Sequence, residues 1–442
     1  MSSPHRIVLG ASARRADLLA LSCCSAIAFV VFCLFPNHQV ADSNYTVLVA
    51  ENLIYERSQR LDAHFRRPLD PSIYPALTPS GLPYQVMLLE GHVVYAYPIG
   101  TSILSIPFVA ALNRVGVFAT KTDGRSDPDG ERRIQALLAA SVCAATVAVL
   151  YSIARLRFGV RASAAVALLA AFGSSLFSTM SRVLWSSTVE TLLLSVCVWL
   201  LAAHEIENAR LHPALLGTAL AWAYFCRPTA ALAVVGVLVY LGCRRRIRSA
   251  LETGIAVTCW LAGFALFSFA TIGDALPIYY RGISLSFSSW SLEGAVANLV
   301  SPSRGLLLFS PILLLAVPLL FTEPPREPPE RRLILLCLSV CSAHVLLLGF
   351  NPSWWGGHCY GPRMSAELLP WLFLLALLAF ARHTGAPLRA VAIALCLWGV
   401  FVHARGAGSL ATLQWNVTPR NVDDDPIRVW SIRNPQFLAG LP

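Results

Sequence analysis

Charged residues are scarce in this chain. Asp, Glu, Lys and Arg together make up 13% of its 442 residues, whereas hydrophobic residues make up 56%. A soluble protein of this size would have too few polar side chains to cover its surface. The composition therefore excludes a water-soluble globular enzyme and predicts a membrane protein.

Lysine is almost absent too, since Lys121 is the one lysine in a chain of net charge +10. The basic residues are therefore arginines, which in a membrane protein mark cytoplasmic loops first and anion binding second; nucleic acid is not an expected partner. The 12 cysteines form no CxxC pair and most lie in apolar runs, so neither a disulfide framework nor a zinc site is indicated. No small-residue cleavage site follows Phe35, which favours a retained first span over a signal peptide.

Long apolar runs recur along the whole chain. They predict an all-α polytopic membrane protein with about eleven transmembrane helices. The expected spans are 16–36, 134–154, 163–180, 187–203, 212–225, 229–242, 251–272, 305–321, 333–350, 365–381 and 389–405. A further run, 99–119, is broken by Pro98, Gly100 and Pro107 and carries Asn113 and Arg114 near its end, so its crossing has to be decided on other grounds.

The arginines decide this question. If 99–119 does not cross, the arginines between spans, including those of 244–248, collect on one side; if it does cross, most of them move to the other side, which the positive-inside rule disfavours. We therefore expect 99–119 to lie in the outer interface. A single transmembrane domain, 1–405, would then carry a long outer loop, 37–133, and be followed by a short outer tail, 406–442.

Polar residues of the first outer loop are candidates for chemistry. Asp42 follows the first span, and the stretch Thr46–Asp62 is typical of an amphipathic interfacial helix, with Glu51 on its polar face. Asp42 is interpreted either as a functional carboxylate held at the membrane boundary or as a helix N-cap or solvated loop acid. The Tyr97–Gly100 segment, YPIG, is either a site of substrate approach or an ordinary break before the 99–119 helix.

Later connections carry further charged residues near the membrane. Arg182 and Glu190 lie between and within neighbouring spans, and an acid at that depth needs a partner or a water-filled cavity. Arg227 interrupts a long apolar run immediately before Pro228, which stops the preceding helix. A structural ion pair and a snorkelling side chain are the alternative interpretations.

The strongest local signals are the segments 301–311 (SPSRGLLLFSP) and 351–363 (NPSWWGGHCYGPR). In each, an arginine lies at the outer mouth of a span among Gly, Pro and hydroxyl residues, which suits phosphate binding. Aromatic residues of the second segment are typical of sugar stacking or of an interfacial belt. The candidates are Arg281, Arg304 and Arg363 for phosphate, and Trp354, Trp355 and Tyr360 for a sugar ring.

The order of these motifs on one side of the membrane resembles the glycosyltransferase-C superfamily. The resemblance rests on Asp42–x–x–Tyr45, the YPIG segment, the acid Glu190, the RPT break and the later arginine loops. More closely, the chain resembles bacterial members akin to protein O-mannosyltransferases and the lipid A aminoarabinose transferase. It spans most of the chain, in topology more than in identity.

The resemblance implies an inverting transfer of a sugar from a polyprenyl-phosphate donor to a lipid or glycan acceptor on the outer face of a bacterial inner membrane. It assigns Asp42 as general base and Glu190 as a second acid, with Arg304 and Arg363 holding phosphate; Tyr45, Tyr97, Arg182 and Arg281 complete the expected donor site. Ser43 replaces the second acid of the common Asp–Glu pattern, so a divalent metal is left open rather than predicted.

Two other classes remain open. A lipid-linked sugar transporter or flippase would also be polytopic with charges at membrane depth, although it ordinarily has related halves and charges near the midplane. A non-catalytic subunit of an envelope-glycan assembly would share the topology alone. Sugar transfer by the purified protein separates the enzyme from both.

Overall fold

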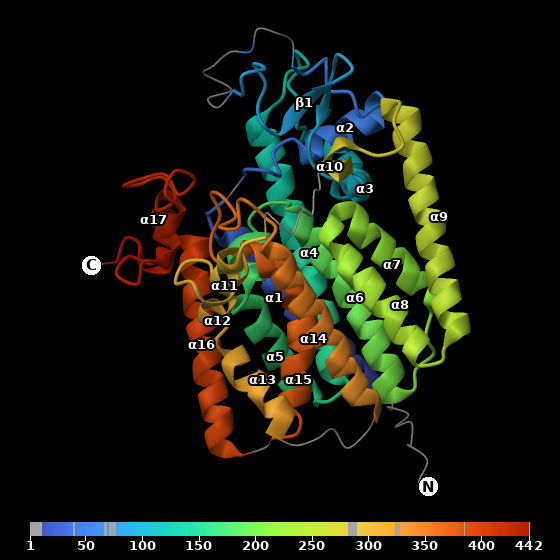
Figure 1. Ribbon diagram of the computed structural model, residues 1–442, viewed down its shortest axis with the longest axis vertical. Helices are drawn as coiled ribbons and strands as arrows, with labels where there is room; N and C mark the ends of the chain where they lie inside the picture. Colours follow the sequence, from blue (N-terminus) through green and yellow to red (C-terminus); the bar gives the residue numbers. More distant parts are fainter. Residues whose placement is uncertain are drawn as a thin grey trace.

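The computed structural model describes residues 11–38, 40–65, 69, 77–281, 290–322, 328–383 and 385–441. Helices dominate it, and Figure 1 shows a bundle of long helices with a smaller unit above it. The predicted all-α membrane class is confirmed. A hairpin, β1 (Val86–Leu89) and β2 (His92–Tyr95), is an addition that the sequence analysis did not predict.

Each predicted span overlaps an apolar helix, although the structure does not confirm that all eleven cross the membrane. Among the described residues, seven helical segments are long and apolar enough to cross a membrane, and α5, α7, α8 and α13 are shorter apolar helices. The helices of the bundle are α1 (Ala11–Leu34), α4 (Pro128–Arg155), α5 (Val160–Phe172), α6 (Ser186–Glu207), α7 (Pro213–Cys226), α8 (Ala231–Cys243), α9 (Ile247–Ile272), α13 (Ile312–Thr322), α14 (Pro328–Leu348), α15 (Leu369–Phe380) and α16 (Ala386–Gly408).

Three of the predicted spans are broken at one end. The run 163–180 becomes α5 and a π-helical turn, η1 (Leu176–Met180), while 305–321 becomes α12 (Leu306–Phe309) and α13. Pro311 follows Ser310 at the second break, and proline cannot donate the backbone hydrogen bond that a continuous helix needs. The 365–381 run begins as a 3₁₀ turn, η4 (Arg363–Leu368), before α15.

The unit above the bundle is built from the first loop. It contains α2 (Thr46–Tyr55), the antiparallel hairpin with Val86 opposite Tyr95, and α3 (Gly100–Arg114). The Glu90–Gly91 turn has φ of 51° and 86°, the backbone that a two-residue hairpin turn favours. This unit rests on the bundle through a core that includes Phe225 and Phe264 of α7 and α9, whose rings stack 4.1 Å apart.

Helix α3 corresponds to the predicted interfacial run 99–119. It has 15 residues, contains Pro107, and lies beside α2 in the upper unit rather than within the bundle (Figure 1). The helix that follows Asp42 is shorter than the predicted 46–62: α2 ends at Tyr55.

The opposite end of the bundle gathers arginine–carboxylate pairs. Arg155 bonds to Asp17 at 2.8 Å, and Arg244 and Arg246 lie 2.9 and 3.0 Å from the carboxylate of Glu205. The upper unit of α2, the hairpin and α3 lies toward the other end, together with the segment around 351–363 and the tail with α17 (Leu410–Gln414) (Figure 1). The helix bundle therefore keeps the two sets of connections apart, as the arginine distribution predicts.

Candidate functional site

Asp42 lies in a turn that three side chains hold through hydrogen bonds. The Tyr95 hydroxyl donates to the Asp42 carbonyl oxygen at 2.8 Å. The amides of Gln85 and Gln135 donate to the carbonyl oxygens of Ala41 at 3.0 Å and Ser43 at 2.7 Å. These bonds tie the turn to the hairpin region and to α4, so the backbone that carries the Asp42 carboxylate is held in place.

A buried acid from α4 binds the N-terminus of α2, the helix that follows this turn. Tyr45 has a left-handed backbone (φ 72°), and Glu131 of α4 accepts hydrogen bonds from the backbone N–H groups of Val47 (2.8 Å) and Leu48 (2.9 Å). A carboxylate at a helix N-terminus satisfies free N–H groups and complements the helix dipole. The sequence analysis did not single out Glu131; the signal was an acid in the first turn of an apolar helix.

The Asp42 carboxylate pairs with Arg363, which is 321 positions away in the chain. The Tyr84 hydroxyl donates to the other carboxylate oxygen of Asp42 at 3.3 Å, and Tyr97 also forms a hydrogen bond with the Asp42 side chain. Burial would raise the pKa of Asp42, but the Arg363 charge and these hydrogen bonds outweigh it and hold the pKa below its ordinary value. Asp42 is therefore an ionised carboxylate with 27% of its side chain exposed.

Arg363 begins η4 and joins several parts of the molecule. Its guanidinium carbon lies 3.9 Å from the ring centre of Trp185, and its Nη1 donates to the Gly356 carbonyl oxygen at 3.0 Å. Among the described residues, none accepts a hydrogen bond from its buried Nε. Asp42, Arg363, Tyr84, Tyr97 and Trp185 thus form one cluster, which we call the Asp42 site.

The sequence analysis predicted three members of this site and missed two. Asp42, Tyr97 and Arg363 were candidates, whereas Tyr84 and Trp185 were not. Gly100, in the YPIG segment, allows the start of α3 to approach α7: a Cβ there would lie 2.3 Å from the Phe225 carbonyl carbon. This close packing explains the glycine.

Arg304 does not join the Asp42 site. It is 1% exposed, and its guanidinium donates to Trp355 O (2.8 Å), Ser303 O (3.1 Å), Gly357 O (3.3 Å), Asn416 Oδ1 (2.9 Å) and Gln436 Oε1. With its donors engaged by protein oxygens, it has none left for a phosphate. Its role here is to bind the 351–363 segment to the C-terminal tail.

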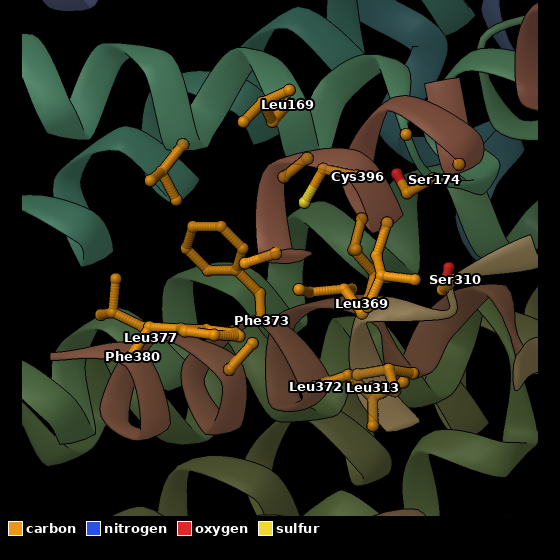
Figure 2. Close-up of a pocket in the computed structure, with 18 of the residues that line it drawn as sticks. Leu169, Ser174, Ser310, Leu313, Leu369, Leu372, Phe373, Leu377, Phe380 and Cys396 are labelled. Carbon is orange, nitrogen blue, oxygen red and sulfur yellow. The ribbon is translucent and has the colours of Figure 1, made fainter. Parts of the chain in front are cut away.

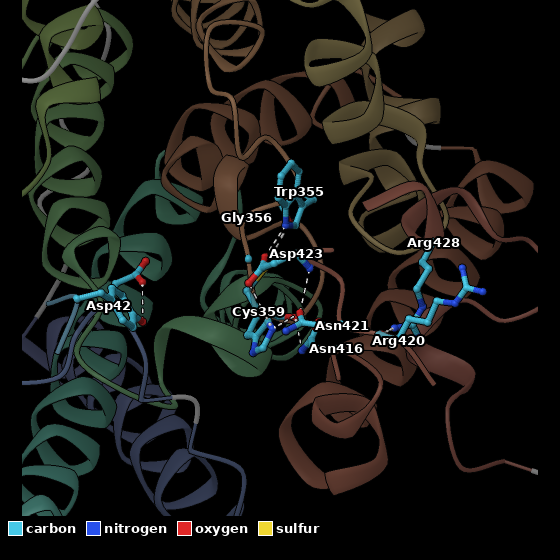
Figure 3. Close-up of polar contacts among 12 residues, drawn as sticks. Asp42, Trp355, Gly356, Cys359, Asn416, Arg420, Asn421, Asp423 and Arg428 are labelled. Atoms are coloured by element: carbon cyan, nitrogen blue, oxygen red, sulfur yellow. Dashed lines mark hydrogen bonds and ion pairs between the residues drawn. The ribbon is translucent and has the colours of Figure 1, made fainter. Parts of the chain in front are cut away.

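The aromatic candidates of the 351–363 segment pack against the protein. Trp354 is buried in a small core beneath the tail, and the Tyr360 hydroxyl donates to the Val402 carbonyl oxygen at 2.6 Å. The Trp355 indole donates to Asp423 at 2.7 Å (Figure 3). Figure 3 also shows Asp42 apart from these segment–tail contacts. Their geometry supports structural roles rather than sugar stacking.

Two other predicted residues, Arg182 and Tyr45, lie in the protein core. Arg182 is buried and donates to the carbonyl oxygens of Phe32 (2.6 Å) and Phe35 (2.8 Å), where it caps the end of α1. Tyr45 is buried with its ring edge-on to Phe65. The Arg281 side chain lies outside the described residues.

Glu190 and Glu51 are buried acids. Glu190, the fifth residue of α6, is fully buried, and the Thr229 hydroxyl lies 3.4 Å from it. The predicted placement of Glu51 on the polar face of its helix is wrong: it is 2% exposed and accepts from Ala119 N at 2.7 Å and the Thr120 hydroxyl at 3.1 Å. Burial raises its pKa. The helical pattern missed this because the 119–120 segment folds back over α2.

An apolar cavity of about 550 Å³ lies between α5, α13, α15 and α16 (Figure 2). Leu169, Leu313, Phe373 and Leu377 are among its lining residues. Ser365, two residues after Arg363, is also part of its wall. The cavity is suited to a hydrocarbon chain, and its wall continues into the turn that presents Arg363.

Metal ligands were left open by the sequence. Within the described ranges, no three His, Cys, Asp or Glu side chains group as ligands for an ion. The acid of the Asp42 site is paired with an arginine instead, so no step below is assigned to a metal.

Comparisons with known proteins agree with this architecture. Residues 130–272 match the family described as dolichyl-phosphate-mannose-protein mannosyltransferase. The structure is similar to ArnT from Cupriavidus metallidurans in the apo state, with a TM-score of 0.54 and 14% identity over 93% of this chain and 67% of that chain.

The ArnT structure bound to undecaprenyl phosphate matches with a TM-score of 0.50 and 14% identity, over 90% of this chain and 72% of that one. No curated protein matches the sequence. The predicted resemblance is confirmed at the level of the fold: the chain is similar in fold to ArnT, and its residues 130–272 match a mannosyltransferase family.

Proposed function

We propose that this protein is an integral membrane glycosyltransferase that moves a sugar from a polyprenyl-phosphate donor to a lipid or glycan acceptor of the cell envelope. The observation that carries the proposal is the pairing of Asp42 with Arg363. This pair supports the proposal because a carboxylate that can accept a proton lies beside a cation that can bind phosphate.

Asp42 is the general base in this proposal. The acceptor hydroxyl attacks the anomeric carbon while its proton passes to the Asp42 carboxylate. The bond between the anomeric carbon and the phosphate oxygen breaks, and the electron pair leaves with the polyprenyl phosphate. One displacement inverts the configuration at the anomeric carbon.

Arg363 binds the donor phosphate. Its guanidinium offers the planar fork that phosphate accepts, and its buried Nε has no acceptor among the described residues. While it is paired with Asp42 it lowers the basicity of that carboxylate. A phosphate that draws Arg363 toward itself therefore increases the basicity of Asp42, so donor binding prepares the base.

The apolar cavity below η4 takes the polyprenyl chain. Its volume of about 550 Å³ and its hydrocarbon lining suit an isoprenoid, and the Ser365 wall links it to the turn that carries Arg363. The binding of undecaprenyl phosphate by the similar ArnT supports this class of ligand.

The arginine distribution supports an inner-membrane location with the Asp42 site on the outer face. The arginines of 244–248 lie at the end of the bundle opposite the upper unit, and the positive-inside rule assigns such an end to the cytoplasm. An acceptor of the cell envelope would then reach Asp42 from outside.

Sugar transfer by purified protein tests the function. The wild type and Asp42→Asn are each given undecaprenyl phosphate carrying a radiolabelled hexose or pentose, with envelope lipid extract as acceptor. We expect labelled product from the wild type and a decrease of about 10² or more in the variant, since asparagine keeps the shape but cannot take the proton.

Two results would contradict this function. Transport of the intact labelled donor across proteoliposomes without transfer would favour the flippase alternative. Undiminished transfer by an Asp42→Asn protein of normal yield would remove Asp42 from the role of base.

A further inference from the structure

A second polar cluster is connected to the Asp42 site by the 3₁₀ turn η4, which carries both Arg363 and Glu367. The Glu367 carboxylate, 2% exposed, lies 3.1 Å from Arg227 Nε and accepts from the Thr229 hydroxyl at 3.0 Å. His344 Nε2 is 3.6 Å from the same carboxylate. We call Glu190, Arg227, Thr229, His344 and Glu367 the Glu367 cluster.

The cluster draws on four separate parts of the bundle: α6, the α7–α8 junction, α14 and η4. Arg227 and Thr229 flank Pro228 at the junction of α7 and α8, and His344 comes from the last turns of α14. His344 also lies 2.9 Å from the Met364 carbonyl oxygen, immediately after Arg363. Both ends of the short 3₁₀ turn η4 are therefore fixed from outside.

Glu367 and Arg363 belong to that same turn, η4 (Arg363–Leu368). Movement of Glu367 would leave Arg227 as a buried charge without its partner, which is strongly unfavourable away from water. The ion pair thus fixes the backbone from which Arg363 extends. Apolar packing alone would permit rotation of the turn at a smaller cost.

The cluster also explains why Arg227 interrupts the long apolar run. The Arg227 side chain is 11% exposed and forms an ion pair with Glu367 of η4. Glu190 is joined to the cluster through the Thr229 hydroxyl, 3.4 Å away, and no described residue donates to the second oxygen of either carboxylate. One hydroxyl hydrogen serves one carboxylate at a time, so Glu367, the nearer acceptor, holds it.

We propose that Glu367, anchored by Arg227 and Thr229, is a positioning residue for Arg363. This inference rests on the proposed function, in which Arg363 exchanges between Asp42 and the donor phosphate. A fixed η4 keeps both positions within reach of one guanidinium. The effect of Glu367 on the donor is therefore transmitted through Arg363.

A double-mutant cycle tests this transmission. Undecaprenyl phosphate is titrated into the wild type, Glu367→Gln, Arg363→Lys and the double variant in detergent, with tryptophan fluorescence as the signal because Trp185 contacts Arg363. We expect Glu367→Gln to weaken binding about tenfold in the wild-type background and to change it little in the Arg363→Lys background. Equal weakening in both backgrounds would overturn the inference.

Glu205→Gln is the matched control. Glu205 is a buried partner of Arg244 and Arg246 at the opposite end of α6, the helix that carries Glu190. We expect this variant to lose thermal stability without a change in undecaprenyl phosphate affinity. Thr229→Val provides a second, milder change to the Glu367 cluster if Glu367→Gln does not fold, and we expect it to show the same dependence on Arg363.

A thermal-unfolding cycle separates this inference from the proposed function. If Arg363→Lys binds undecaprenyl phosphate as tightly as the wild type, the phosphate role of Arg363 fails. The cycle of Asp42→Asn with Glu367→Gln then decides the positioning role without any ligand. A smaller melting-temperature decrease from Asp42→Asn in the Glu367→Gln background supports it, because Arg363 is then no longer aligned with Asp42; additive decreases overturn it.

Discussion

At the scale of single residues, environment separates arginines that look alike in the sequence. Arg304 and Arg363 each lie within two residues of a proline and a glycine, at the start of an apolar run. Arg304 is saturated by protein oxygens, while Arg363 combines an acid, an indole ring and an Nε without an acceptor among the described residues. Donor satisfaction therefore distinguishes a structural arginine from a candidate ligand-binding one.

The two arginines should respond differently to conservative substitution. We expect Arg363→Lys to weaken undecaprenyl phosphate binding by roughly ten- to a hundredfold, because lysine loses the planar fork and the stacking on Trp185. Arg304→Lys should lower the melting temperature and leave the affinity of the folded fraction unchanged. The reverse pattern in a titration would place the phosphate at Arg304.

Protonation of Asp42 should appear in the stability of the protein. Its folded pKa lies below the ordinary value of 3.8, so the Asp42–Arg363 pair stabilises the folded state fully above that value and loses its effect as pH falls through the lower, folded pKa. We expect a constant melting-temperature difference between wild type and Asp42→Asn from pH 8 to about 5, which narrows below about 4. A difference that instead grows in acid would contradict the ion pair.

At the scale of elements, the upper unit depends on how closely α3 approaches α7. Gly100 begins α3 next to the carbonyl carbon of Phe225, and the stacked Phe225–Phe264 pair continues the contact into α9. The YPIG segment thus packs closely against α7 through Gly100, and this packing places Tyr97 beside Asp42. The position of Tyr97 is a consequence of the glycine three residues later.

Gly100→Ala should destabilise this junction. The added Cβ would lie 2.3 Å from a backbone carbon, so α3 has to shift, at a cost of about 1–3 kcal/mol. Gly263→Ala, within α9 and with no atom within 4 Å of its added Cβ, is the control and should be neutral or stabilising. Thermal unfolding of both variants in detergent measures the contrast; equal melting temperatures would show that the junction has room.

At the scale of the whole molecule, the two ends of the bundle differ in chemistry. One end has arginine–carboxylate pairs such as Arg155–Asp17, and the other has the upper unit, the Asp42 site and the tail. The separation follows from helix lengths and from the cost of moving charge through hydrocarbon. It gives the proposed reaction a single face of the membrane.

This polarity can be tested by labelling. Single cysteines introduced at Arg245 and Asp424 in a background without the native cysteines are treated with a membrane-impermeant maleimide. We expect position 424 to react in intact cells and position 245 to react only after permeabilisation. Labelling of position 245 in intact cells would reverse the proposed orientation.

The sequence alone determined the membrane class, the positions of the apolar helices and the separation of the two ends, because these depend on local hydrophobicity and on the placement of arginine. It also identified Asp42 and Arg363 as candidates. The tertiary structure decided which candidates meet: contacts between residues 42 and 363, or between 227 and 367, depend on how distant helices pack. It likewise decided that Arg304, Tyr360 and Glu51 are buried, because satisfaction of a polar group by distant partners leaves no periodic signal in the chain.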